Sequence, residues 1–179
     1  KKPPQSWLTL ALSLQFQQSN FKKVLSVLKR LIVLYPKRNY WLQLSGVYGE
    51  LGDEARSLAA MELAYEAGYA TTKPDIVMLV RLLMNQSVPH KGALILDKAM
   101  GAEVIPRDVE NLKLLATCWM QAREYNNAIA PLSEAAKQSE DGELYVRLAQ
   151  LHLEQENWQK AATSLEGALS KGGLREPGQ

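Results

Sequence analysis

The chain has 179 residues, of which 46% are hydrophobic and 22% charged, and a formal net charge of +2 at pH 7. This length allows one ordinary domain or one short repeat array, and the apolar content excludes a globally disordered chain. A single cysteine excludes a disulfide framework within the chain. Two histidines and one cysteine, far apart in the sequence, offer few ligands for a zinc site. No run of residues is both long and apolar enough to span a bilayer.

Five units of two helices each are predicted along the chain. In the first helix of each unit, an apolar residue is followed three positions later by a second one and then by a residue that is usually small. These spacings place all three on one helical face. The three columns are Leu8, Trp41, Ile76, Leu112 and Tyr145, then Ala11, Leu44, Leu79, Leu115 and Leu148, then Leu12, Ser45, Val80, Ala116 and Ala149.

The second helix of each unit carries a mostly small residue and, four positions later, a large one. The small residues recur every 33 to 36 positions, which is the period of helix–turn–helix repeats. Two antiparallel helices approach closely only where one side chain is small, and a large neighbour then fills the groove between them. The small column is Val24, Ser57, Gly92, Ala128 and Ala161, and the large column is Leu28, Met61, Leu96, Leu132 and Leu165.

Turn-forming residues separate the predicted helices, for example at Gly52-Asp53 within the second unit. The first and third units carry Leu12 and Val80 where a small residue is usual, so we expect their helices to pack more loosely. The predicted repeats span residues 5–36, 37–70, 71–106, 107–140 and 141–172, and residues 173–179 are expected to form a linker or the start of a further repeat.

This pattern resembles the tetratricopeptide repeat (TPR) family over nearly the whole chain. The clearest copies are the second, with Trp41 and Tyr48, and the fifth, with Tyr145 and Trp158; the third departs from the family because Pro89 stands where an aromatic residue is usual. The resemblance implies an all-α fold, a right-handed α-solenoid of five helix–turn–helix repeats.

Three stretches resemble a narrower group in more detail: repeat proteins of Gram-negative bacteria associated with TonB-type energy-transduction systems. They are residues 40–52, 59–62 and 141–149, and residues 172–179 are similar to a junction between repeats of that group. The resemblance implies an accessory protein in the bacterial periplasm. We also expect the array to continue beyond Gln179, because terminal repeats need a polar cap and none is visible.

The N-terminal residues allow an alternative interpretation as a signal peptide, because Lys1 and Lys2 precede the apolar residues 7–14. No small-x-small cleavage site follows, and residues 8–31 fit the repeat columns. The repeat interpretation is therefore favoured.

No catalytic chemistry is predicted. His90 is expected in a turn, His152 occupies a column where the repeat family has a large packing residue, and Cys118 lies within a helix. A nucleophile needs an adjacent base, and the sequence contains no nucleophile elbow, phosphate loop or metal-ligand cluster. We therefore expect no enzyme activity, no cofactor and no metal site.

The first helices line the inner wall of such arrays, and the resemblance implies which of their columns face inward and form a partner-binding groove. Arg81, Lys113 and Arg147 are interpreted as a basic ladder for an acidic peptide or helix, and Met84 and Met120 as adaptable apolar contacts. The alternative is that these are ordinary solvated side chains. The complete set is Arg81, Met84, Asn85, Lys113, Thr117, Met120, Gln121, Arg147 and Gln150. The Lys–Asn pair of carboxylate-clamp relatives does not occur.

Charge is divided unevenly along the chain. Residues 1–49 hold eight basic and no acidic side chains, whereas residues 50–179 hold 13 basic and 19 acidic ones. A solvated outer face is the commonest explanation. Binding to a membrane surface or to nucleic acid is a weaker alternative, and head-to-tail self-association between the basic and acidic ends is a third.

The sequence therefore predicts a non-catalytic protein–protein interaction scaffold, an accessory of a TonB-type envelope system, with a protein or peptide partner and no transmembrane segment. Two alternatives stay open: a helical-repeat RNA-binding module, and the recruiting domain of a larger enzyme. RNA binding is not expected, because neither an aromatic stacking platform nor a per-repeat base code is evident.

Overall fold

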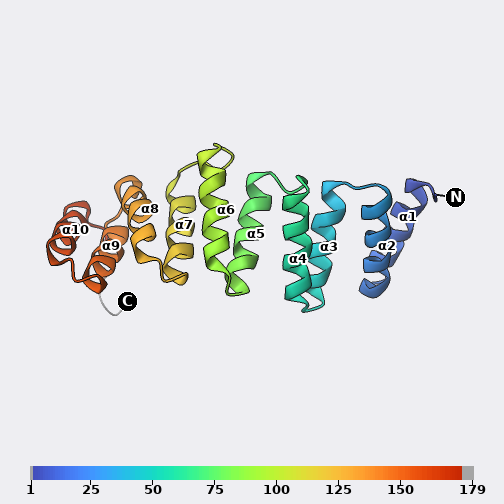
Figure 1. Ribbon diagram of the computed structural model, residues 1–179, viewed down its shortest axis with the longest axis horizontal. Coiled ribbons are helices and arrows are strands. Elements are labelled where there is room, and N and C mark those ends of the chain that lie inside the picture. Colours follow the sequence, from blue (N-terminus) through green and yellow to red (C-terminus); the bar gives the residue numbers. More distant parts are fainter. Residues whose placement is uncertain (1, 175–179) are drawn as a thin grey trace. The chain divides into compact units, whose positions relative to one another are not determined.

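The computed structural model describes residues 2–174, and within them the chain forms ten α-helices and no strand. This confirms the predicted all-helical class. The helices are α1 (Gln5–Gln17), α2 (Phe21–Leu34), α3 (Arg38–Glu50), α4 (Glu54–Glu66), α5 (Lys73–Asn85), α6 (Pro89–Gly101), α7 (Val109–Gln121), α8 (Tyr125–Gln138), α9 (Glu143–Glu154) and α10 (Trp158–Lys171), as labelled in Figure 1. None of the described helices is long and apolar enough to cross a membrane.

The chain divides into two compact units. The first runs to Ser87 and contains α1–α5, and the second starts at Val88 and contains α6–α10. Within each unit, every helix packs against the next one along the chain. The division falls inside the third predicted repeat. The bounds of the five repeats stay predictions, and residues 175–179 of the predicted linker lie outside the described residues.

The turn inside each repeat has the same backbone conformation. One residue in each turn has a φ between 52° and 72°, in the left-handed region. Only one of the five is a glycine, so the other four positions hold side chains in a conformation that costs free energy. These residues are Ser19, Gly52, Ser87, Arg123 and Glu156, and they recur with the same spacing as the small column.

The second helix of each repeat begins two residues after this turn position. In two repeats the intervening residue caps the helix. The Asn20 side chain accepts a hydrogen bond from the Lys23 amide at 3.4 Å, and Asp53 accepts one from the Arg56 amide at 3.1 Å. Such caps satisfy amides that have no partner within the helix.

The small column lies at the closest contact between paired helices, as predicted. All five of its residues are buried. In the second repeat, the Ser45 hydroxyl of α3 lies 2.9 Å from the Ser57 carbonyl oxygen of α4 and 3.1 Å from the Ser57 hydroxyl. Only small side chains let two helices approach so closely.

The large column is buried in four of the five repeats, and Leu165 is the exception. The four other residues are at most 1% exposed, whereas Leu165 is 42% exposed. Its expected burial is wrong, because within the described residues no later helix packs over α10. The periodicity of apolar residues identifies the apolar face of a helix, but it does not show whether a neighbouring helix covers that face.

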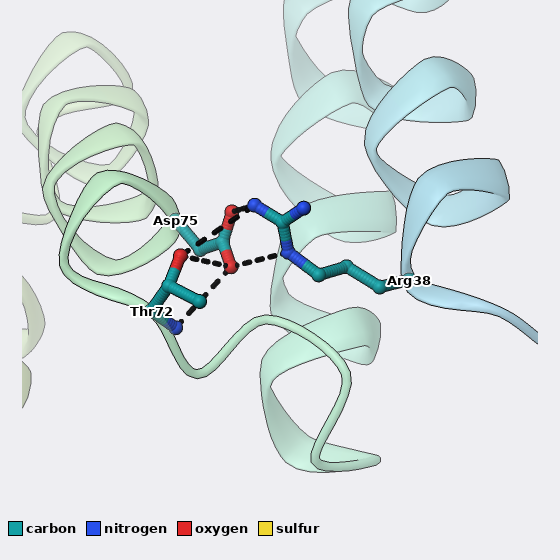
Figure 2. A network of polar contacts seen from close by, with 3 residues as sticks. All are labelled: Arg38, Thr72 and Asp75. Atoms are coloured by element: carbon teal, nitrogen blue, oxygen red, sulfur yellow. Dashed lines mark hydrogen bonds and ion pairs between the residues drawn. The ribbon is translucent and has the colours of Figure 1, made fainter.

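An ion pair joins two repeats of the first unit (Figure 2). The Arg38 guanidinium at the start of α3 donates from Nε to Asp75 Oδ2 at 2.8 Å and from Nη2 to Asp75 Oδ1 at 2.5 Å. Thr72 adds its amide and hydroxyl, at 3.2 and 2.7 Å from Asp75 Oδ2. Burial raises the pKa of Asp75, but the hydrogen bonds from Arg38 and Thr72 outweigh this effect, so the pKa lies below its ordinary value.

In the second unit, Lys171 of α10 caps the end of α8. Its ammonium group donates to the carbonyl oxygens of Ala136 and Lys137, both at 2.9 Å, and to that of Ser139. These carbonyl groups lie at a helix end, where intrahelical partners are missing. Nearby, the Gly142 amide donates to the Gly172 carbonyl oxygen at 2.8 Å, and a Cβ at Gly142 would collide with the Ala168 backbone.

Replacing Ala128 with leucine should overpack the contact between α7 and α8 and lower the free energy of unfolding by roughly 1–3 kcal/mol. Urea unfolding followed by circular dichroism measures the change. Ala130→Leu on the same helix is the matched control, because Ala130 is exposed. Equal effects of the two substitutions would contradict the column assignment, and Ala161→Leu repeats the test in the last repeat.

Replacing Asp75 with asparagine should lower the urea midpoint at pH 7, because the carboxylate that binds Arg38 and Thr72 is lost. A carboxyl group whose pKa is lowered on folding stabilises the folded state above its unfolded pKa of about 3.9, and this stabilisation disappears as the pH falls through the folded pKa. The difference in urea midpoint between wild type and variant should therefore become smaller below about pH 4. Glu66→Gln, an exposed change in the same unit, should leave a constant and small gap.

Candidate partner-binding groove

Two hollows lie side by side on α7 and α9 of the second unit, and both are bordered by Arg147. The larger, which we call the α7–α9 hollow, encloses about 480 Å³. The smaller, the charged hollow, encloses about 230 Å³. The α7–α9 hollow is lined by Thr117, Met120, Gln121, Tyr125, Arg147, Gln150, Leu151 and Glu154.

Helical spacing explains how the α7–α9 hollow is built. Thr117, Met120 and Gln121 lie three and four positions apart on α7, so they share one face, and Arg147, Gln150 and Glu154 do the same on α9. The Thr117 hydroxyl donates back to the Lys113 carbonyl oxygen at 2.7 Å. The threonine therefore presents mainly its methyl group and its hydroxyl lone pairs to a ligand.

The charged hollow brings together side chains of both signs. Lys113 and Arg147 line it together with Asp141 and Glu143. One carboxylate oxygen of Asp141 already accepts hydrogen bonds from the Ser139 hydroxyl at 3.2 Å and the Glu143 amide at 3.1 Å. Lys113 and Arg147 are the cationic donors of this hollow, because lysine and arginine side chains carry only donors.

A third hollow lies on α5 of the first unit. It encloses about 370 Å³ and includes the predicted residues Arg81 and Asn85. Its other lining residues are mostly apolar and include Met78 and Leu82. Met84, also predicted, is half-buried on the same helix and does not line this hollow.

Five of the nine predicted groove residues thus meet in the α7–α9 hollow: Thr117, Met120, Gln121, Arg147 and Gln150. The basic ladder is brought together in part. Lys113 and Arg147 border the same hollow, whereas Arg81 belongs to the other unit and aligns by repeat spacing with Thr117 and Gln150 rather than with the two other cations.

Sequence reasoning did not place Tyr125 and Leu151 in the predicted set, although both line the α7–α9 hollow. Tyr125 is the first residue of α8, and Leu151 directly follows Gln150 on α9. The geometry of the turn before α8 is what brings the tyrosine to the edge of the groove.

The groups considered for catalysis lie on three different helices: His90 on α6, Cys118 on α7 and His152 on α9. Cys118 is buried, and burial raises the pKa of its thiol to about 12, so it is a neutral thiol at pH 7. His90 is the second residue of α6 rather than part of a turn, and its Nδ1 contacts Glu124. Among the described residues, no cluster of three or more His, Cys, Asp or Glu side chains could hold a metal ion.

The basic residues of the first repeat lie on α2. Lys22, Lys23, Lys29 and Arg30 are all exposed, and the Lys29 ammonium lies 5.7 Å from the centre of the Tyr48 ring. Their exposure agrees with the solvated outer face expected from the sequence. The weaker alternatives of a membrane or RNA surface also depend on these four side chains.

Comparisons with known proteins agree on a repeat fold. A family model described as "Anaphase-promoting complex, cyclosome, subunit 3" matches residues 91–168, less than half of the chain. No curated protein sequence matches significantly. Among solved structures, "Crystal structure of YrrB: a TPR protein with an unusual peptide-binding site" is 16% identical, with 95% of this chain and 87% of that chain covered and a TM-score of 0.67.

Two MamA structures are similar as well. One, from Desulfovibrio magneticus RS-1, is 12% identical over 93% of both chains, with a TM-score of 0.61. The other, described as "Crystal structure of MamA protein", is 12% identical over 93% of this chain and 90% of that chain, with a TM-score of 0.65. The chain therefore has the fold of tetratricopeptide-like helical repeat proteins. None of the families and structures found in these comparisons is described as an enzyme.

His152 provides a test of the packing interpretation. It is buried in α9, its Nδ1 makes no hydrogen bond with any described group, and burial, aided by the charge of Lys160, lowers its pKa. A base whose pKa is lowered on folding destabilises the folded state as the pH falls below its unfolded value of about 6.5.

Replacing His152 with leucine should raise the free energy of unfolding. It should also remove part of the decrease in this free energy that the wild type shows between pH 7.5 and pH 5. Urea midpoints of wild type and variant at both pH values measure this, and the gap should be wider at pH 5. His90→Leu, at an exposed histidine, is the comparison variant. A gap that is the same at both pH values would show that His152 does not resist protonation in the folded state.

Proposed function

We propose that the chain is a scaffold that binds a peptide segment of a partner protein across α7 and α9. The observation that carries this proposal is the pair of adjoining hollows that share Arg147 and gather six residues predicted from sequence. Both hollows combine polar and charged side chains with some apolar surface, which suits the side chains of an extended or helical segment. The description of YrrB as having a peptide-binding site supports a peptide ligand for this fold and is applied to this chain only as part of the proposal.

The lining suggests the chemistry of that segment. At one end, Lys113 and Arg147 favour a carboxylate. At the other end, Met120, Tyr125 and Leu151 supply apolar and aromatic surface. Met120 adapts to different shapes because its side chain is flexible and polarisable. The segment that fits best therefore carries an acidic residue followed or preceded by a large apolar one.

The finer assignment to a TonB-type system of the bacterial periplasm rests on the resemblance of residues 40–52, 59–62 and 141–149 alone. The comparisons add no support for it. We retain it as a proposal because it names a compartment and a class of partner. Fractionation of cells that produce the complete natural protein tests the compartment directly: recovery with cytoplasmic markers would contradict it.

Reversing the three cations with Arg81→Glu, Lys113→Glu and Arg147→Glu should abolish capture of acidic peptides without unfolding the chain. The probe is an array of twelve-residue peptides in which each acidic member is paired with its Asn or Gln counterpart. Affinities of the selected peptides are measured by fluorescence anisotropy. Loss of charge-assisted hydrogen bonds should weaken binding by about tenfold or more, since each 1.4 kcal/mol is a factor of ten.

The matched control combines Lys22→Glu, Arg30→Glu and Lys98→Glu, which make the same change in net charge at exposed positions outside the hollows. This control should keep its peptide affinity. Equal loss in both triple variants would mean that net charge alone attracts the peptides. Unchanged binding in the groove variant would show that the basic residues are solvated and unused, and Met120→Asp then tests the apolar end separately.

A further inference from the structure

The outer side of α2, in the first unit, carries positive charge only. Its exposed residues lie three, four, seven and eight positions apart, so they form one stripe opposite the buried Val24, Leu28 and Leu31. At the usual helical rise this stripe is about 16 Å long. We call it the basic stripe, and it consists of Lys22, Lys23, Ser26, Lys29, Arg30 and Val33.

The repeat pattern does not impose this charge. At the position of Lys22, none of the other four repeats holds a lysine or an arginine. At the position of Lys29, three of the other four hold a carboxylate, namely Glu62, Asp97 and Glu166. Nor is the charge balanced nearby in the sequence, because residues 1–49 contain no Asp or Glu. Solvation requires charge but not charge of one sign, so the uniform sign of the stripe indicates an anionic partner.

The apolar member of the stripe narrows the class of partner. Val33 lies among the cations and is 79% exposed, and the lysine and arginine side chains add apolar stems beneath their charged ends. At the surface of a bilayer, cationic groups meet lipid phosphates while apolar side chains enter the boundary with the acyl chains. The stripe offers both kinds of contact on one side of one helix.

Nucleic acid fits this surface less well. Binding of single-stranded nucleic acid depends on aromatic rings on which bases stack, and no member of the stripe is aromatic. The aromatic residues at the two ends of α2, Phe21 and Tyr35, are half-buried. Tyr35 is also held in place, because its hydroxyl donates to the Pro3 carbonyl oxygen at 2.8 Å.

We propose that the basic stripe docks the chain on a bilayer surface rich in anionic lipid, with α2 parallel to the membrane plane. The contact is peripheral and depends on ionic strength, because salt screens the attraction between exposed cations and lipid phosphates. The peptide groove belongs to the second unit. Docking through the stripe and peptide binding in the groove are therefore separate properties that different variants remove.

Binding to vesicles tests the proposal. The probes are vesicles of phosphatidylcholine alone and vesicles in which phosphatidylglycerol makes up about a third of the lipid, at low salt. In a co-sedimentation titration, the wild-type chain should bind the anionic vesicles and not the neutral ones. An increase in ionic strength of about tenfold should release most of the bound chain.

Neutralising the four cations of the stripe should weaken binding to the anionic vesicles by about a hundredfold or more, since each cation at such a surface contributes roughly a factor of five. The substitutions are Lys22→Gln, Lys23→Gln, Lys29→Gln and Arg30→Gln. If the quadruple variant loses its helical circular dichroism, the two double variants at positions 22 and 23 and at positions 29 and 30 replace it, each with a loss of about tenfold or more.

The matched control makes the same change in net charge at exposed positions of the second unit, outside the hollows, and should bind the vesicles much as wild type does. Its substitutions are Lys91→Gln, Lys98→Gln, Lys137→Gln and Lys160→Gln. Val33→Ser keeps the net charge and should weaken vesicle binding several-fold, because an apolar contact is lost. The quadruple stripe variant should keep the peptide affinity of the groove, which separates this test from that of the proposed function.

Four outcomes would overturn the proposal. Absence of binding to anionic vesicles at low salt would mean that the stripe is only solvated or has another partner, and retention of the same chain on single-stranded RNA would identify that partner as nucleic acid. Equal binding to neutral and anionic vesicles would exclude recognition of charge. Equal loss in the stripe and control variants would mean that net charge alone attracts the chain. Unchanged binding of Val33→Ser would contradict the placement of α2 against the bilayer.

Discussion

The structure depends on a close approach of two helices that only small side chains permit. Neither helix of a repeat can bury its apolar face alone. Each therefore packs against the other helix of its repeat, which a short turn connects to it. Ser45 and Ser57 show how tight this approach is, because their hydroxyl groups touch across α3 and α4. Once the pair has formed, large residues such as Leu28 and Leu132 project to one side, where only the next repeat can cover them. Stability is therefore shared between neighbours rather than concentrated in one core.

Much of this could be predicted from sequence because repetition removes the ambiguity of single helices. Five examples of the same column fix its phase, and all five residues of the predicted small column are buried in the second helices. Contacts between repeats could not be predicted in the same way. The ion pair of Arg38 with Asp75 joins residues 37 positions apart and appears in one repeat only. Periodicity shows which face of a helix points inward, whereas the partner across the junction depends on register and on the turn geometry.

The groove illustrates the same limit on a functional surface. Its predicted α7 and α9 residues come from the inward-facing columns of the repeat family that the chain resembles, and five of the eight residues that line the α7–α9 hollow were predicted in this way. Tyr125 was missed because it belongs to a different helix and reaches the hollow through the turn at Arg123, whose positive φ redirects the chain. Arg81 was grouped with Lys113 and Arg147 because all three are basic. Alignment of the repeats places Arg81 on a different turn of its helix from the other two.

The cap that Lys171 makes has a consequence for how the chain is built during synthesis. The carbonyl groups at the end of α8 receive their donor from a residue more than 30 positions later. While the chain emerges from the ribosome, α7 and α8 can pair, but the last turn of α8 must rely on water until α10 has been made and docked. Domains generally fold as units, the N-terminal one first during synthesis. Because its donor belongs to the fifth repeat, we expect the last turn of α8 to be fully hydrogen-bonded only once α10 has docked.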